Sequence, residues 1–414
     1  SSTPGSLPSP IPASTRTTPT LVEISPGDHN GRMDPDTASP TNSKRPETTI
    51  GLPTKHRSRQ SLMDAQSLLT LTDRGLYCPP GGFHIDPWKP VPRAVVTHAH
   101  SDNARAGSER YLALDSCAGV LKRRIGADST VDTLRPGESL QIEGVRLSLH
   151  PAGHILGSAQ VRLEYRGRVA VVSGDYKTEP DPTCAPFEPL RCNLFISECT
   201  FGLPIYRWSA QERVFAEINA WWRAARDHRR TCLLLGYSLG KAQRLLAGLD
   251  REIGPIHTHG AVEEMTTIYR AEGVRLPPTS PVAALAPDHD FAGSLILAPP
   301  AAHDTPWARR LGDLTTGLAS GWMTIRGARR RRAIDRGFVL SDHADWPGLL
   351  LAIEQTGCEE VWLTHGYTAS LGRYLNDQGR HARTLATQFQ GEAGADASDS
   401  EPSPTTTTEG NSDA

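Results

Sequence analysis

The chain has 414 residues, of which 37% are apolar and 22% charged, and its formal net charge is −2. This balance excludes a chain-wide polybasic surface, so any site for a nucleic acid must be a local patch. The seven cysteines form no Cys-x-x-Cys pair, which excludes a disulfide scaffold and a cysteine zinc knuckle, and a cytoplasmic location is expected. No apolar run reaches membrane-spanning length, so no membrane span is expected.

Both ends of the chain are predicted to be disordered. Residues 1–64 are rich in Pro, Ser and Thr, and residues 391–414 combine Thr and Ser with acidic side chains. Such segments bury too little apolar surface to offset the entropy of ordering them. The ordered body is therefore expected to span residues 65–390.

The first part of this body is predicted to be rich in strands. Short β-branched runs bounded by Gly or Pro occur within residues 93–98, 144–154, 161–175 and 193–198. Runs of this length and composition are typical of buried strands rather than helices.

The middle of the body is predicted to be helical. Apolar residues recur every three to four positions in 209–230 and again in 238–254, where Ser238 is expected to cap the helix. A Pro- and Ala-rich stretch at 277–287 is expected to be a loop.

The last part returns to strands. Residues 336–357 and 359–379 each have the pattern of a strand, a turn and a helix. Strands and helices therefore alternate along the body, which predicts an α/β protein.

The strongest chemical signal is the segment VVTHAHSDN, in which an apolar strand runs into His98, His100 and Asp102. On an extended segment every second side chain points the same way, so two imidazoles and a carboxylate can converge. Transition metals bind such mixtures of nitrogen and oxygen ligands. This segment predicts a metal site.

Further His and acidic residues follow other apolar strands. His154 comes after a glycine in PAGHILG, and Asp175 ends the strand before SGDYK. Each alone is more typical of a structural residue, but a carboxylate that bridges two metal ions is the usual way to hold an ion pair. The same placement recurs at Glu198, at His343 in the segment SDHAD and at His365. Because strand ends of layered α/β folds converge on one edge, these residues are expected to share a site.

An arginine run precedes the His343 segment. It comprises Arg329, Arg330, Arg331 and Arg332. A solvated basic turn explains it as well as a phosphate clamp does, although guanidinium groups pair bidentately with phosphate oxygens.

Together these segments resemble the β-CASP nuclease branch of the metallo-β-lactamase superfamily. The His-x-His-x-Asp-His signature of that branch is met at positions 98–102, with Asn103 in place of the last His, and its later motifs match the strand-end residues above. Several stretches, among them AGHILGSAQVRLEY, GWMTIRGARRRR and GFVLSDHADWPGLL, are similar to the bacterial ligase-associated DNA exonucleases. The resemblance covers about residues 66–390.

The resemblance implies an αββα sandwich with an inserted α/β cap. The sandwich would comprise residues 65–205 and 337–390, and the cap residues 206–336. Two divalent ions, zinc or manganese, would be held by the residues His98, His100, Asp102, His154, Asp175 and His365, with Asn103 a doubtful ligand. Catalysis would rest on the residues Asp175, Glu198 and His343.

The function that follows is metal-dependent hydrolysis of DNA, as an exonuclease in DNA repair that acts with a DNA ligase. RNA remains an alternative substrate, because the β-CASP branch includes RNA 3′-end processing nucleases and no motif here reads a 2′-hydroxyl. A small-molecule hydrolase is disfavoured by the long inserted segment. A nucleic-acid-binding protein with a degenerate site is favoured only by Asn103, whose amide oxygen is a weaker zinc ligand than an imidazole.

Overall fold

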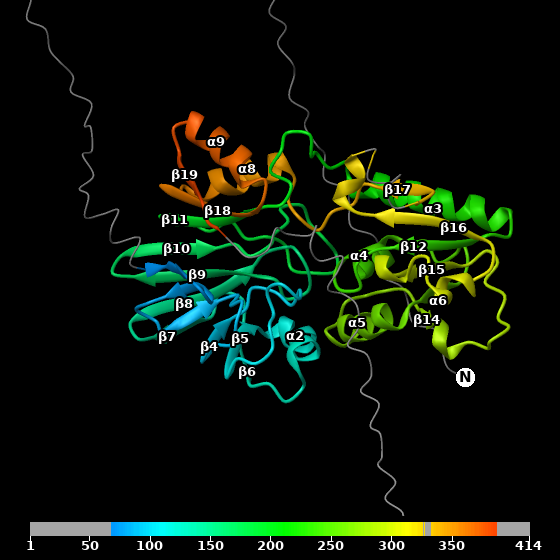
Figure 1. Ribbon diagram of the computed structural model, residues 1–414, viewed down its shortest axis with the longest axis horizontal. Coiled ribbons are helices and arrows are strands. Elements are labelled where there is room, and N and C mark those ends of the chain that lie inside the picture. Colours follow the sequence, from blue (N-terminus) through cyan, green and yellow to red (C-terminus); the bar gives the residue numbers. More distant parts are fainter. Residues whose placement is uncertain (1–67, 326, 328–332, 387–414) are drawn as a thin grey trace, which may run out of the picture. The chain divides into compact units, whose positions relative to one another are not determined.

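The computed structural model of the protein describes residues 68–325, 327 and 333–386. Both predicted tails lie outside these residues. The described part is of mixed α/β character, as predicted, and its strands form three sheets (Figure 1). Within the same part, no helix combines the length and apolar character needed to cross a membrane.

The first sheet is built from the strands that begin the body. Its six strands pair in chain order, with antiparallel pairs first and parallel pairs from the third strand onward. They are β1 (Thr70–Thr72), β2 (Gly75–Cys78), β3 (Phe83–Ile85), β4 (Arg93–Val95), β5 (Arg110–Leu114) and β6 (Val131–Leu134).

The second sheet joins strands from both ends of the body, in the order β19-β18-β11-β10-β9-β8-β7. Its strands are β7 (Ser139–Ile142), β8 (Val145–Pro151), β9 (Ala159–Tyr165), β10 (Arg168–Val172), β11 (Leu194–Cys199), β18 (Glu360–Gly366) and β19 (His381–Thr384). The strands from β10 to β19 are parallel neighbours, and β11 pairs directly with β18 although the whole third sheet lies between them in the sequence.

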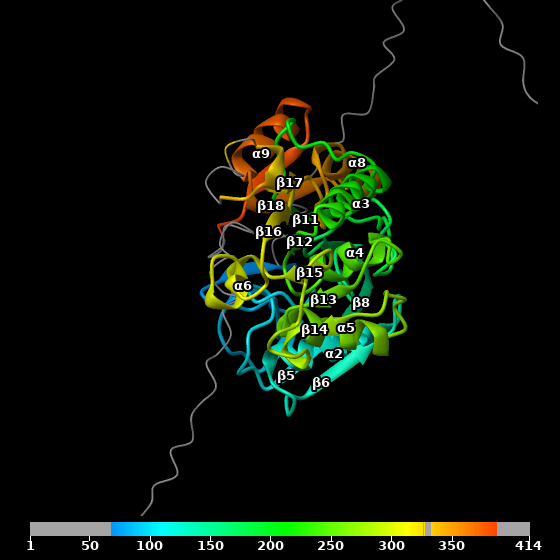
Figure 2. The ribbon, with the colours of Figure 1, turned by 90° about the vertical axis from the view of Figure 1, so that its right-hand side faces the viewer.

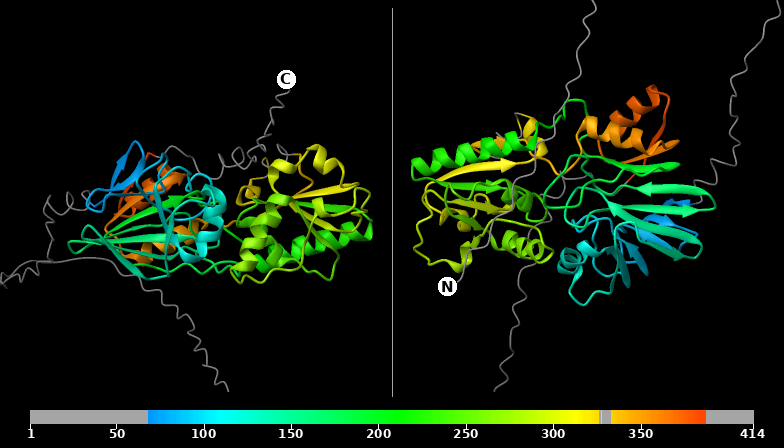
Figure 3. Two further views of the ribbon diagram at one scale, coloured as in Figure 1. Left: turned by 90° about the horizontal axis from the view of Figure 1, so that it is seen from below. Right: turned by 180° about the vertical axis from the view of Figure 1, so that it is seen from behind.

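One hydrophobic core lies between these two sheets. Alternate residues of both sheets, such as Phe83 and Leu112 of the first and Leu147 and Ile196 of the second, belong to a single buried cluster. Figure 3 shows the blue strands of the first sheet against the green strands of the second. The far face of the second sheet is covered by α8 (Trp346–Thr356) and α9 (Thr368–Asp377). The helix α2 (Ala118–Ile125) follows the short 3₁₀ turn Asp115–Cys117 and packs with the first sheet in the same buried cluster.

The third sheet is entirely parallel and has the order β14-β13-β15-β12-β16-β17. Its strands are β12 (Thr231–Leu235), β13 (Ile256–Thr258), β14 (Ser280–Pro281), β15 (Leu295–Ala298), β16 (Leu314–Ala319) and β17 (Arg336–Phe338). Its helices are α3 (Gln211–Asp227), α4 (Lys241–Gly248), α5 (Gly260–Ala271) and α6 (Pro306–Arg309), with 3₁₀ turns at Val282–Ala284, Pro300–Ala302 and Gly321–Thr324.

Helices cover both faces of this sheet, as a parallel sheet requires. The helices α3, α4 and α5 pack on one face of the sheet and α6 packs on the other, and each face has its own apolar cluster. Figure 2 shows α3, α4 and α5 on one side of the strands and α6 on the opposite side.

The predicted helices and strands are present. The middle of the body is not only helical, however, because it also carries the strands of the third sheet, and the predicted loop at 277–287 contains β14 and a 3₁₀ turn. A further correction concerns a helix end. The helix that starts near Ser238 is capped by Gly240, not by Ser238. Gly240 has a φ of +88°, and its N–H donates to the Gln243 side chain at 2.8 Å. The turn before the helix is therefore a glycine turn, and the carbonyl of Ser238 accepts from the same Gln243 amide.

Candidate metal centre

The site is assembled where strands of the two facing sheets end. His98 follows β4, His154 lies between β8 and β9, and Asp175 follows β10. Glu198 and His365 lie near the ends of β11 and β18, which are paired neighbours. The strand-end placement seen in the sequence therefore does bring these residues to one edge.

Four of the predicted ligands form a compact group. One ligand atom from each of His98, His100, His154 and Asp175 lies within 4.8 Å of the others. His98 Nε2 is 3.4 Å and His154 Nε2 3.9 Å from Asp175 Oδ2. The three imidazole rings stand nearly perpendicular to one another, with centroids 4.8–4.9 Å apart. This is a site of three nitrogens and one carboxylate oxygen.

The orientation of His98 is fixed by a chain of hydrogen bonds behind it. Thr97 Oγ1 donates to Asp86 Oδ2 at 2.6 Å, so the same hydroxyl oxygen accepts from His98 Nδ1 at 3.0 Å. With its proton on Nδ1, His98 presents the lone pair of Nε2 to the site. That atom is buried and makes no hydrogen bond within the described residues.

Backbone carbonyls orient the other two imidazoles. His100 Nε2 lies 3.2 Å from the carbonyl of Leu239, and His154 Nδ1 lies 2.9 Å from that of Asp342. A carbonyl only accepts, so these nitrogens carry the protons and the opposite nitrogens carry lone pairs. Those two lone-pair atoms, His100 Nδ1 and His154 Nε2, face each other at 3.1 Å. Two acceptors that converge in this way repel unless a cation lies against both, so the group fits a bound metal ion.

Burial acts on the charges of this group. His98 and His154 are buried, and burial holds the pKa of each well below its ordinary value. Both are therefore neutral at neutral pH, the form that binds a metal. Burial also raises the pKa of Asp175 well above its ordinary range, so its carboxylate form needs a nearby positive charge.

His343 is paired with Glu198 beside this group. His343 Nδ1 lies 2.9 Å from Glu198 Oε1, and both side chains are buried. Burial works to raise the pKa of Glu198, but His343 and the N–H of Thr200, at 3.0 Å, outweigh it and lower the pKa. Glu198 is therefore a carboxylate that orients His343, whose Nε2 lies 3.9 Å from Asp342 Oδ1.

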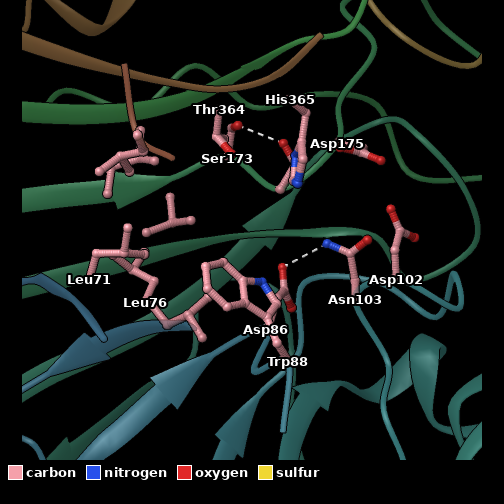
Figure 4. A pocket seen from close by; sticks show the side chains of 15 residues that line it. Leu71, Leu76, Asp86, Trp88, Asp102, Asn103, Ser173, Asp175, Thr364 and His365 are labelled. Atoms are coloured by element: carbon pink, nitrogen blue, oxygen red, sulfur yellow. Dashed lines mark hydrogen bonds between the residues drawn. The ribbon is translucent and has the colours of Figure 1, made fainter. Parts of the chain in front are cut away.

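The remaining predicted ligands line a pocket on the other side of Asp175. Figure 4 shows Asp102, Asn103 and His365 with Asp175 at one end of this pocket, and apolar side chains at the other. Its volume is about 60 Å³, room for about two water molecules but not for a nucleobase. Among the described residues, Asp102 and His365 do not join a group as tight as the first. Of the residues predicted as ligands, the described structure therefore gathers only His98, His100, His154 and Asp175 in one compact group, and the two further compact groups both include His343.

Asn103 has a fixed orientation in this pocket. Its Nδ2 donates to Asp86 Oδ2 at 3.0 Å, which leaves Oδ1 buried without a partner in the described part of the chain. The amide oxygen is thus the atom that Asn103 can offer to a metal. Asp86 and His365, which flank it, both have positive φ, +44° and +57°, a strained conformation that is common at functional sites.

Two groups behind the candidate ligands were not predicted from the sequence. One is the Leu239 carbonyl, because a backbone atom carries no residue signature. The other is Lys241, which is fully buried and whose Nζ lies 2.5 Å from Asp342 Oδ1. Burial works to raise the pKa of Asp342, but Lys241 outweighs it and holds the pKa well below its ordinary range. A lysine in an amphipathic helix is expected to face solvent, so this pair could not be predicted from the sequence.

Other His and acidic residues close in sequence to the predicted ligands have structural roles. Asp345 caps α8, where it accepts from the N–H of Gly348 at 2.9 Å. His150 pairs with Glu188 at 3.1 Å, away from the ligand group. The predicted phosphate clamp, Arg329 to Arg332, lies outside the described residues.

The chain is similar to three curated proteins among others. A protein named "Probable DNA ligase" from Opitutus terrae is 31% identical over 325 residues, which are 77% of this chain and 31% of that protein. "Cleavage and polyadenylation specificity factor 73" of Drosophila melanogaster is 29% identical over 41% of this chain and 27% of that protein. "Endoribonuclease YSH1" of Yarrowia lipolytica is 29% identical over 29% of this chain and 14% of that protein.

The chain therefore spans less than a third of the length of each of these relatives. No family model matches it.

Proposed function

Because this chain is a homologue of the β-CASP nucleases of the metallo-β-lactamase superfamily, we propose that it hydrolyses phosphodiester bonds of a nucleic acid with bound metal. One observation carries the proposal: the lone pairs of three imidazoles, of which those of His98 and His154 are buried and neutral, converge beside the Asp175 carboxylate. A site built only for structure would not leave such acceptors facing one another.

In this proposal His98, His100 and His154 would hold a first metal ion, and Asp175 would be shared with a second. A divalent ion bound there would supply a nucleophilic water at neutral pH and positive charge for the phosphate oxygens. The second ion would rest on Asp102, Asp175 and His365, with the Asn103 amide oxygen as a weaker ligand. Oxygen-rich ligation makes manganese a better match than zinc for this second position.

His343 is the proposed general acid. Its Nδ1–H donates a hydrogen bond to Glu198 Oε1 at 2.9 Å. A second proton, carried on Nε2, can therefore pass to the leaving oxygen of the substrate. Glu198 stabilises the protonated ring and keeps it from rotating. The His343 ring centroid is 4.7 Å from that of His154, so the proposed acid would lie beside the proposed first metal.

We further propose that residues 206–336, which contain all of the third sheet except the last two residues of β17, form a β-CASP-like cap on a metallo-β-lactamase sandwich of residues 65–205 and 337–390. The loop after β12 supports this view, because its Leu239 carbonyl orients a ligand of the site. The tails 1–64 and 391–414 are proposed to be dispensable for catalysis.

DNA is the proposed substrate, with exonuclease action in repair alongside a DNA ligase in the cytoplasm. The relative named as a DNA ligase is similar over 77% of this chain, whereas the two named for RNA processing are similar over 41% and 29%. RNA is the second candidate, because those two relatives carry RNA-related names.

The test is a parallel digestion of end-labelled DNA and RNA oligonucleotides of one sequence, single- and double-stranded, with zinc or manganese added. Stepwise shortening of DNA with little cleavage of RNA is expected. Preferential cleavage of RNA would favour the second candidate. No cleavage of any substrate, under conditions where the protein binds metal, would contradict the proposed function.

A further inference from the structure

A cluster of five aromatic side chains lies next to the proposed catalytic residues. Its members contact one another through Phe201, whose ring centroid is 4.8 Å from Tyr206 and 4.9 Å from both Trp208 and Trp322. Tyr367 completes the cluster, 5.9 Å from Tyr206 and 6.4 Å from Trp322. We call these five residues the aromatic cluster.

The cluster is adjacent to the site on two sides. The Phe201 ring centroid is 5.9 Å from that of His343, and the indole N–H of Trp208 donates to the His343 carbonyl at 2.9 Å. Tyr367 comes two residues after His365, and its N–H donates to the Cys199 carbonyl at 2.9 Å. The backbone of the site therefore sets the position of these rings.

Trp322 reaches the cluster from the third sheet. It lies in the 3₁₀ turn after β16, and Gly321 allows the turn to approach Phe201, because a Cβ at position 321 would come within 2.4 Å of the Phe201 ring. The turns that follow β12 and β16 thus both reach the site. The turn after β12 orients His100, and the turn after β16 contributes the indole of Trp322.

The cluster is not a sealed core. Phe201 and Tyr206 are fully buried, but Trp208, Trp322 and Tyr367 keep part of their surface exposed. The segments that carry the five rings, 200–210, 320–325 and 364–374, contain no acidic residue. These segments therefore contribute no carboxylate that would repel the phosphates of a nucleic acid near the rings.

We propose that the exposed surfaces of Trp322 and Tyr367 stack on an unpaired base of the substrate strand, next to the phosphate that is cut. Aromatic rings recognise single strands in this way without sequence preference, because every base has a π-face. This inference rests on the proposed nuclease function. It adds that the strand end must be unpaired at the site, so that a duplex has to fray before it is cut.

The test removes the ring and the base separately. Single-stranded DNA oligonucleotides of one length carry a single abasic site, moved through each of the positions nearest the labelled end. KM and kcat are measured for the wild type, Trp322→Ala and Trp322→Phe. Trp307→Ala is the matched control, because Trp307 is a partly exposed tryptophan on α6 that packs on His259 instead.

Trp322→Ala is expected to raise KM about tenfold on intact DNA, with little change in kcat, while Trp322→Phe and Trp307→Ala stay near the wild type. At one abasic position the KM of the wild type should rise by the same factor. The KM of Trp322→Ala should not rise further at that position, because the two changes remove the same contact.

Three results would overturn the inference. A loss in Trp322→Ala that is the same at every abasic position would mean that the ring only holds the turn in place, as would a fall in melting temperature that accounts for the loss. An unchanged KM in Trp322→Ala, in a protein that cuts DNA, would reject the stacking surface but keep the nuclease. Failure of the wild type to bind or cut nucleic acid would reject both.

Discussion

Lys241 is expected to be as important to the metal centre as the ligands that touch the metal. Its Nζ lies 2.5 Å from Asp342 Oδ1, and neither side chain is more than 2% exposed. Asp342 in turn holds His154 through its carbonyl at 2.9 Å. In Lys241→Met the carboxylate stays buried without its cation, and breaking a buried pair on one side costs about 3–5 kcal/mol.

The same change should loosen His154. Removal of a group that orients a metal ligand typically lowers metal affinity about 10–100-fold. Stability is measured by urea unfolding followed by tryptophan fluorescence, and zinc affinity by competition with a chelator, so neither readout depends on catalysis. Lys241→Arg, which keeps the charge, is expected to retain more affinity than Lys241→Met.

Two controls isolate the buried pair. Arg110→Met breaks an exposed pair, with Asp132 at 2.8 Å, and should cost less than about 1 kcal/mol. The double variant Lys241→Met with Asp342→Leu removes both charges and should recover much of the lost stability. The reasoning is refuted if Lys241→Met is no less stable than Arg110→Met, or if its zinc affinity equals that of the wild type.

Four further predictions follow from the same site and from the sequence. Asp175→Ala should abolish nuclease activity while circular dichroism shows an intact fold; full activity would remove Asp175 from the ligands. A chain of residues 65–390 should unfold cooperatively and cut as well as the full chain, and loss of cooperativity would show that a tail is structural. Neutralising Arg330 and Arg331 together should flatten the salt dependence of DNA binding by a slope of about one per lost phosphate contact, and an unchanged slope would assign the run to solvated surface. Asn103→His should lower the metal concentration needed for activity and raise bound metal toward two ions per chain by elemental analysis; two tightly held ions in the wild type would contradict a weak second position.

Sequence reasoning works where a residue type and its local position coincide. His98, His100, His154 and Asp175 combine metal-binding side chains with strand ends, and the structure places them within 4.8 Å. Their roles as ligands stay predictions, but their proximity was readable because parallel strands end at a common edge. The alternation of strands and helices could also be predicted, because the periodicity of apolar residues is a local property of the sequence.

The groups that orient these ligands were not readable. The Leu239 carbonyl and the Lys241 ammonium reach the site from more than 100 residues away, in a segment whose pattern indicates only an amphipathic helix. The misplaced cap at Ser238 has a related cause. A serine before a helical pattern is normally the cap, but Gly240 turns the chain at positive φ to bring Leu239 to the site.

The direct pairing of β11 with β18 also constrains how the protein is made. Thr364 of β18 must find Glu198 of β11, and on a ribosome the whole third sheet is synthesised before that partner emerges. The third sheet is complete at Phe338, before β18 is made, whereas β11 must wait with the edge that pairs with β18 uncovered. We expect the segment that ends before β18 to be a target for chaperones, and the metal centre to close in the last step of folding, when His365 arrives.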